Sequence, residues 1–213
     1  MRRNAEATRA SILDAAERVF AQHGFAGAAA SAIARDAGVT KSLIHHYFGS
    51  KEQLWDAVKV RRYAEYVAAQ QAVLSSPMDS PEEAEAVLTR SLRTLFDFLA
   101  SNPRFVRLLS WVQLEGGQVD LAVRELPELG MKRLREAQSA GMIRPDVDPS
   151  HMVAAFFALI EHWFQARERN HVRLGTPLTD GARQEADEAY FRDVRKMFLQ
   201  GLLPQARSGS AVE

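Results

Sequence analysis

The chain has 213 residues, and its 27 lysines and arginines balance its 27 aspartates and glutamates, so the formal net charge is zero. A hydrophobic fraction of 46% beside 25% charged residues is typical of a folded globular protein and excludes disorder over most of the chain. The lack of cysteine excludes disulfides, thiolate metal sites and cysteine nucleophiles. No apolar run reaches the roughly 18 residues of a membrane span, and the mixed charges near the N-terminus do not resemble a secretion signal. We therefore expect a soluble, cytoplasmic protein of one large or two modest domains.

The charges are distributed unevenly along the chain. Residues 1–62 carry a formal charge of +4, and the remainder carries −4. This distribution is typical of a basic domain that binds a polyanion and an acidic domain that does not.

Apolar residues recur at helical spacing along the whole chain, and the pattern predicts an all-α fold. Gly24 and Gly38 each follow a segment with apolar residues at helical spacing, and a glycine in this position is typical of a helix end. Thr40 and Ser50 each precede such a segment, and their hydroxyl groups are typical of an N-cap. About nine helices are expected, over residues 6–22, 29–36, 41–48, 51–74, 81–101, 103–115, 120–140, 149–170 and 183–203.

The first three helices have the spacing of a helix-turn-helix unit. Residues 36–40, Asp-Ala-Gly-Val-Thr, join the second helix to the third, and Gly38 permits the sharp turn. A small core is closed by five apolar side chains, those of Ile33, Ala34, Val39, Ile44 and Phe48.

The motifs of this segment point to a known family. They read Phe20-x-x-x-Gly24-Phe25, then Ile33-Ala34-x-x-Ala37-Gly38-Val39-Thr40-Lys41, then Ile44-x-x-Tyr47-Phe48-x-x-Lys51-Glu52-x-Leu54. Residues 8–58 thereby resemble the DNA-binding domain of the TetR family of transcriptional regulators, and the remainder is similar in length and helix order. The resemblance implies a homodimer that binds a double-stranded, palindromic DNA operator and releases it when a small-molecule effector binds. It implies a DNA-binding domain over 1–50 and a ligand-binding and dimerisation domain over 51–207, in which 51–75 connects the two; we expect 208–213 to be a disordered tail.

The third helix is expected to enter the major groove with its N-terminal turn leading. Thr40 and Lys41 suit a phosphate, because a helix N-terminus presents free N–H groups and positive potential. The resemblance adds four phosphate-contacting positions, which are His45, His46, Tyr47 and Lys51.

Base readout requires side chains on the groove face of the second and third helices. We expect this role for Ser31, Arg35, Ser42 and Leu43. Leu43 departs from the small or hydroxylated residue that is common in the family, and we predict that it packs against a thymine methyl group. Residues 28–30 are alanines where the family usually has a hydroxyl cap, so we expect Ser31 or a backbone amide to substitute for it.

The sequence predicts neither a metal site nor a cofactor. His45 and His46 point about 100° apart on a helix, and no third ligand follows at helical spacing. No nucleophile, phosphate loop or metal motif accompanies the acidic residues, so an enzymatic role is not expected.

Two sets of residues are predicted in the C-terminal part. The helix over 149–170 is apolar on all sides and therefore needs a partner chain on one face; the expected dimer residues are Ala155, Leu159, Trp163, Phe191, Val194 and Phe198. A monomer with a completely internal helix is the alternative. Aromatic residues and isolated polar groups predict an apolar effector pocket that includes Phe98, Trp111, Glu115, Phe157, Glu161 and His162. For the polar members, a buried hydrogen-bonded pair is the alternative.

A different class of protein remains open at this point. An all-helical small-molecule-binding or enzymatic protein, whose N-terminal helices serve assembly, would have a similar helical pattern. Salt-dependent binding to duplex DNA separates the two classes, because only phosphate contacts release counterions.

Overall fold

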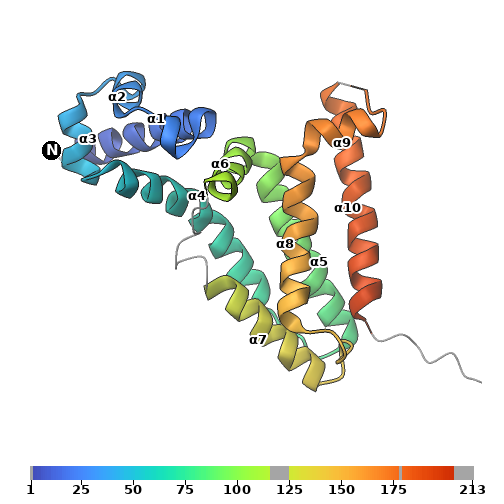
Figure 1. Cartoon of the computed structure of the whole chain (residues 1–213). Helices are drawn as coiled ribbons and strands as arrows, with labels where there is room; N and C mark the ends of the chain where they lie inside the picture. The colour runs from blue at the N-terminus through green and yellow to red at the C-terminus, as the bar shows by residue number, and fades with distance from the viewer. Residues whose placement is uncertain (1, 116–124, 178, 204–213) are drawn as a thin grey trace, which may run out of the picture. The chain divides into compact units, whose positions relative to one another are not determined.

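The computed structural model describes residues 2–115, 125–177 and 179–203, with side chains from residue 5 onward. Within these ranges the chain forms ten helices and no strand, which confirms the predicted all-α class (Figure 1). The helices are α1 (Arg2–Gly27), α2 (Ala30–Ala37), α3 (Lys41–Phe48), α4 (Lys51–Leu74), α5 (Pro81–Ser101), α6 (Pro103–Leu114), α7 (Glu125–Ser139), α8 (Pro149–Gln165), α9 (Arg167–Arg173) and α10 (Asp180–Leu202). The predicted tail over 208–213 and the predicted helical residues 120–124 lie outside the described residues.

Three of the differences between the predicted and the observed helix boundaries have a local structural cause. Gly24, at φ 71° and ψ −178°, leaves the helical conformation where a helix stop is predicted, and α1 continues beyond this kink to Gly27. The single helix predicted over 149–170 is two helices, because Ala166 leaves the helical conformation between α8 and α9. Helix α10 begins three residues before the predicted start, where the Thr179 side chain accepts a hydrogen bond from the backbone N–H of Ala182.

The chain divides into two compact units. The head unit consists of residues 1–68 and 98–124, and the body unit consists of residues 69–97 and 125–213. Each unit therefore combines separate stretches of the chain, and α4 and α5 contribute to both. The functional boundary after residue 50 remains a prediction.

In the head unit, α1 packs against α2 and α6. Ile12, Phe20 and Ile33 are completely buried between these helices. The Phe20 ring meets the Trp55 ring of α4 edge to face, with 4.8 Å between the ring centroids. This apolar core fixes α2, and through it α3, on the rest of the head unit.

A buried carboxylate links α1 to α4 in the same unit. Oε2 of Glu17 accepts hydrogen bonds from Arg61, at 2.9 Å, and from Arg62, at 2.7 Å. This hydrogen bond and the nearby negative charges raise the pKa of the Arg62 guanidinium against the effect of its burial. Glu17 is therefore compensated in the interior, as a buried charge must be.

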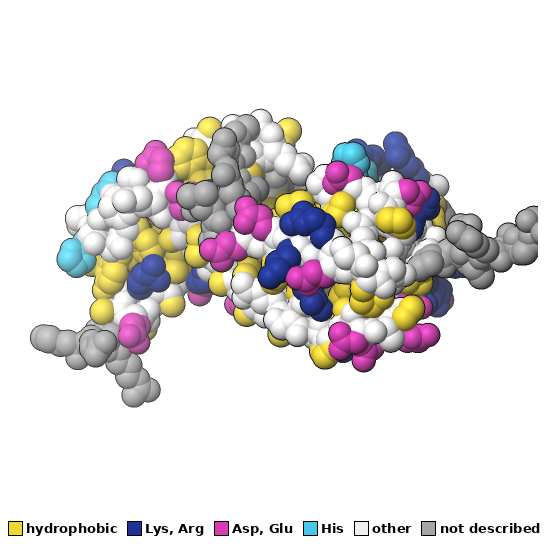
Figure 2. Space-filling view, turned by 90° about the horizontal axis from the view of Figure 1, so that it is seen from below, with side chains coloured by type: hydrophobic (Ala, Val, Ile, Leu, Met, Phe, Trp, Pro, Cys, Tyr) yellow, Lys and Arg dark blue, Asp and Glu magenta, His cyan; other side chains and the backbone are white. Residues whose placement is uncertain are grey.

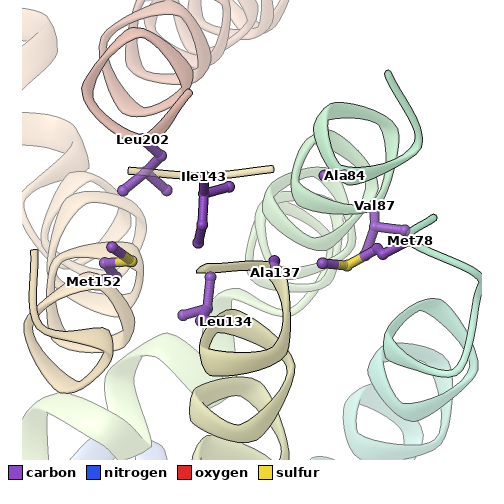
Figure 3. Packing of buried hydrophobic residues seen from close by; sticks show 8 residues of the cluster. All are labelled: Met78, Ala84, Val87, Leu134, Ala137, Ile143, Met152 and Leu202. Carbon is purple, nitrogen blue, oxygen red and sulfur yellow. The ribbon is translucent and has the colours of Figure 1, made fainter. Parts of the chain in front are cut away.

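In the body unit, a core cluster joins α5, α7, α8 and α10 with the loops between them. Figure 3 shows its members converging from these elements; they are Met78, Ala84, Val87, Leu134, Ala137, Ile143, Met152 and Leu202. The Arg144 N–H donates to the carbonyl of Leu202 at 2.8 Å, which ties the loop after α7 to the end of α10.

None of the helices in the described part of the chain combines the length and the apolar character that crossing a membrane requires.

Candidate DNA-binding interface

The turn between α2 and α3 is closed by the backbone. Gly38 adopts the left-handed conformation, at φ 67° and ψ 30°. The N–H of Val39 donates to the carbonyl of Ala34 at 2.9 Å, so the free carbonyls at the end of α2 are satisfied within the turn. A side chain at position 38 meets no neighbouring atom within 4 Å, so glycine is required here for its conformation.

Helix α3 begins at the predicted cap. Thr40 is extended, and its Oγ1 accepts a hydrogen bond from the N–H of Leu43 at 3.3 Å. The hydroxyl of Ser42 lies 2.9 Å from the same oxygen. The start of α2 differs, because Ala29 supplies no side-chain hydrogen bond at the equivalent cap position. The N-cap residue of α2 is thus one of the three alanines, and no side chain caps it.

One face of the α2–α3 unit is buried and the other is open. Ile33, Ala34, Ile44 and Phe48 are buried. None of the ten residues predicted to contact DNA is buried. Ser31, Arg35, Thr40, Lys41, Ser42, His45 and His46 are exposed, and Leu43, Tyr47 and Lys51 are partly exposed. Figure 2 shows histidine side chains at the surface of the part of the molecule that carries α3.

The side chains of His45 and Lys51 also have defined partners. Nδ1 of His45 lies 2.8 Å from the carbonyl oxygen of Gly49. Because a carbonyl only accepts, Nδ1 carries the proton, and Nε2 is the atom left for another partner. The Lys51 ammonium lies 4.6 Å from the centre of the Phe25 ring and donates to the Ala26 carbonyl at 3.5 Å. This hydrogen bond uses one of the three N–H groups of the Lys51 ammonium, and the other two can donate to a phosphate.

Comparison with known proteins identifies the family. Residues 12–58 match the family model of the bacterial regulatory proteins, tetR family, and residues 92–192 match that of the tetracyclin repressor-like C-terminal domain. The HTH-type transcriptional repressor SCO4008 of Streptomyces coelicolor is 31% identical over 199 residues, which cover 90% of this chain and 97% of that protein. The chain belongs to the tetR family. It is a DNA-binding helix-turn-helix transcriptional regulator.

Another curated relative and two solved structures are also similar to this tetR-family chain. The HTH-type transcriptional repressor NicS of Pseudomonas putida is 31% identical over 152 residues, which cover 71% of this chain and 67% of that protein. The crystal structure of the putative transcriptional regulator SCO4942 from Streptomyces coelicolor superposes with a TM-score of 0.68 at 28% identity, over 89% of this chain and 97% of that one. FadR from Bacillus subtilis, solved in complex with stearoyl-CoA, has a TM-score of 0.66 at 20% identity, over 90% and 97% of the two chains, and shows the shared fold.

The residues predicted to line an effector pocket lie in both units of this tetR-family protein. Phe98, Trp111 and Glu115 belong to the head unit, and Phe157, Glu161 and His162 belong to the body unit. The polar atoms of Trp111 and Glu115 are bonded to the backbone of α1: the indole N–H donates to the Ala21 carbonyl, and the carboxylate accepts two backbone N–H groups. These two side chains are therefore engaged within the head unit.

The remaining pocket predictions keep some exposure. Phe98 is partly exposed, and its ring centroid lies 5.4 Å from that of Tyr66 and 5.2 Å from that of Phe105. Phe157 is also partly exposed, and His162 is exposed. Glu161 is partly buried, and this burial raises the pKa of its carboxyl group to about 7.

The residues predicted for the dimer interface separate into two groups. Trp163, Phe191 and Val194 are buried inside the body unit of a single chain. Trp163 stacks on Tyr190 with 3.9 Å between the ring centroids, so its ring is packed within its own chain. Ala155 is exposed, and Leu159 and Phe198 are partly exposed, so these three side chains are the ones that a partner chain can reach.

One buried polar cluster was not found by sequence reasoning. Asp187 of α10 accepts from the indole N–H of Trp163 at 2.8 Å and pairs with Arg167. The completely buried His171 places Nε2 3.4 Å from the same carboxylate. The groups come from three helices, and a single sequence gives no signal that joins them. Within the described residues, no cluster of three or more histidines and acids is arranged to hold a metal ion.

Proposed function

We propose that this regulator is a repressor that binds a palindromic operator as a homodimer and is released by a small, largely apolar ligand. The observation that carries the proposal is the two-faced construction of α3. The apolar side of α3 is buried in the head core, and its polar and basic side is exposed. The regulator acts in the cytoplasm, where the operator DNA is, and by binding rather than by catalysis.

The phosphate backbone is contacted around the start of α3 and the start of α4. The free N–H groups after Thr40, the Lys41 ammonium and the two free N–H donors of Lys51 face an anion favourably. His45, His46 and Tyr47 complete this set further along α3. Such contacts fix the register of the protein on the duplex but read no sequence.

Sequence is read by side chains on the same open face. Ser42 and Leu43 on α3, with Ser31 and Arg35 on α2, reach the base edges. In a homodimer, two copies of α3 dock one helical turn of DNA apart, which makes the operator a palindrome.

Dimerisation uses the open apolar positions of α8 and α10. Ala155 and Leu159 lie one turn apart on α8, and Phe198 lies on α10. Met197, next to Phe198, is 59% exposed, which adds apolar surface on α10 that a second subunit would cover.

Release by an effector is a population shift. In one state of the dimer, the two DNA-binding domains are not spaced to fit the operator. A ligand that binds this state more tightly lowers the affinity for the operator. Phe157, an aromatic side chain of the body unit that keeps partial exposure, supports an apolar ligand.

The DNA-binding proposal is tested by titrating the protein with duplexes obtained by unbiased site selection, at several salt concentrations. Binding should weaken steeply with salt. Lys41→Ala combined with Lys51→Ala should lower affinity for all sequences alike and reduce the salt slope by about 2. Lys132→Ala, an exposed lysine on α7, is the matched control and should leave both unchanged. Operator binding that ignores the double variant would contradict the phosphate assignment.

The dimer proposal is tested by light scattering coupled to size-exclusion chromatography. Ala155→Glu places a charge in the proposed interface and should convert a dimer to a folded monomer, because an unpaired buried charge opposes association. Ala140→Glu makes the same change at an exposed alanine just after α7 and should leave the dimer intact. A wild-type monomer, or a dimer in both variants, would contradict the proposal.

The effector proposal is tested with the apolar fluorophore 1-anilinonaphthalene-8-sulfonate as a probe. The dye should bind the folded protein at a saturable site, and operator DNA should weaken its binding by the same factor by which the dye weakens operator binding. Dye binding that is indifferent to the operator would contradict an apolar site coupled to DNA release.

A further inference from the structure

The end of α1 is held by a carboxylate from a distant part of the chain. After the kink at Gly24, the N–H of Phe25 donates to Oε2 of Glu115 at 3.1 Å, and the N–H of Ala26 donates to Oε1 at 3.0 Å. Glu115 follows the last residue of α6, and its carboxylate thus caps two backbone donors at once. Both partners belong to the head unit.

A second contact strengthens this junction. Trp111 lies one turn before Glu115, and its indole N–H donates to the carbonyl of Ala21 at 3.2 Å. Gly24 fits between the two side chains: a Cβ there would lie 2.7 Å from Oε1 of Glu115 and 2.7 Å from Cε3 of Trp111. The last turn of α6 therefore binds a free carbonyl before the kink and two free N–H groups after it.

The same two residues of α1 hold Lys51 on their other side. The Lys51 ammonium lies 4.6 Å from the centre of the Phe25 ring and 3.5 Å from the carbonyl oxygen of Ala26. Glu115 thus fixes the backbone N–H groups of the residues whose ring and carbonyl locate this ammonium. No direct contact between Glu115 and Lys51 is needed.

We infer that Glu115 is a positioning residue for operator binding, acting through Phe25 and Ala26 on Lys51. This inference rests on the proposed role of Lys51 as a phosphate contact. Glu115 itself touches no DNA in this account. It raises the affinity for the operator by keeping the Lys51 ammonium at the position of a DNA phosphate, so that the lysine side chain loses less conformational entropy when the complex forms.

The sign of the effect separates this role from a simple charge effect. A carboxylate repels DNA, so removing its charge should tighten binding if it acts only through the electrostatic field. Glu115→Gln also loses one of the two hydrogen bonds, because an amide offers one acceptor oxygen and its NH₂ group cannot accept. We therefore expect this variant to bind operator more weakly, by about five-fold, with a salt slope reduced by up to about 0.9 as one phosphate contact is lost.

The experiment is an operator titration at several salt concentrations with wild type, Glu115→Gln, Lys51→Ala and the double variant. In the Lys51→Ala background, Glu115→Gln should cause no further loss, because the two changes remove the same contact. Glu65→Gln, which removes an exposed negative charge from α4 of the head unit, is the control and should bind at least as tightly as wild type. Equal or tighter binding by Glu115→Gln, or losses that multiply in the double variant, would overturn the inference. A wild-type protein that binds no duplex would instead overturn the proposed function.

A second measurement needs no DNA. In the free, full-length protein, the rate of acetylation of Lys51 by acetic anhydride is followed by mass spectrometry, with exposed Lys41 as the internal reference. Release of Phe25 and Ala26 in Glu115→Gln should raise the rate at Lys51 relative to Lys41. An unchanged ratio in a folded variant would refute the positioning role, and Glu115→Asp serves if Glu115→Gln does not fold.

Discussion

The indole N–H of Trp163 donates a 2.8 Å hydrogen bond to Oδ1 of Asp187, a carboxylate that is 4% exposed. The other oxygen of Asp187 pairs with Arg167, so one acid joins α8, α9 and α10. A buried carboxylate at such a junction is expected to be important for stability, because its removal leaves two donors without their partner.

Asp187→Ala should therefore lower the free energy of unfolding by about 3 kcal/mol, since it leaves an arginine charge and an indole N–H uncompensated. Urea denaturation at a fixed protein concentration measures the change. Asp193→Ala, at an exposed position of the same helix, should stay within about 0.5 kcal/mol of wild type. Equal effects of the two substitutions would show that the cluster contributes nothing specific.

Glu161 should make stability depend on pH. Its pKa is about 7 in the folded chain, because burial disfavours the charged form, and 4.5 in the unfolded reference. Below pH 4.5 the group is protonated in both states and costs nothing. As the pH rises to 7, the unfolded state loses its proton first, so stability falls by up to about 3 kcal/mol.

Glu161→Gln should remove this cost. The unfolding free energy of the variant should exceed that of wild type by little at pH 4.5 and by progressively more up to pH 7.5. Subtracting the two proteins cancels the histidines, including the neighbouring His162, because both proteins contain them. Glu185→Gln, at an exposed site on α10, should give a difference that does not change with pH. A flat difference for Glu161→Gln would contradict the effect of burial.

The helix-turn-helix could be predicted from the sequence because its signals are local. Thr40 caps α3 and Gly38 ends α2, as their residue types predict. Each of these residues acts on backbone groups within four or five positions along the chain, so the local sequence is sufficient to predict its role.

Elsewhere the determining contacts are distant in sequence. Trp111 is predicted to line a pocket as one of many large aromatic side chains, and Glu115 as a polar group within an apolar stretch. Their hydrogen-bond partners lie about 90 residues earlier in α1, and the sequence pattern does not indicate them. The helix break at Ala166 coincides with neither a glycine nor a proline, so the sequence does not indicate it. It redirects the chain so that His171 is buried beside Asp187, sixteen residues later. Such pairings are decided by tertiary packing, which a periodicity pattern does not contain.

Leu43 is expected to determine a base preference. It is partly exposed on the open face of α3, and an apolar side chain in the major groove packs against the thymine methyl group. Leu43→Thr should weaken the preference for thymine at one position of each half-site, as measured by repeating the site selection with the variant. Lys41→Ala is the control and should lower affinity without changing the selected sequence. An identical selected sequence for Leu43→Thr would eliminate this role.

The missing cap of α2 offers a way to stabilise the head unit. Ala29 already has the extended conformation of an N-cap, at φ −87° and ψ 133°, but it has no side-chain acceptor. Ala29→Ser should add a hydrogen bond to a free N–H in the first turn and raise the unfolding free energy by about 1 kcal/mol. Ala30→Ser places the same hydroxyl one residue later, inside the helix, and should not stabilise it.

Thr40→Ala is the reverse test at α3 and should lower the free energy of unfolding by about 1 kcal/mol, whereas Thr40→Ser should be nearly neutral. Thermal unfolding of the four variants measures these differences, and a gain for Ala30→Ser equal to that for Ala29→Ser would mean that capping is not the cause.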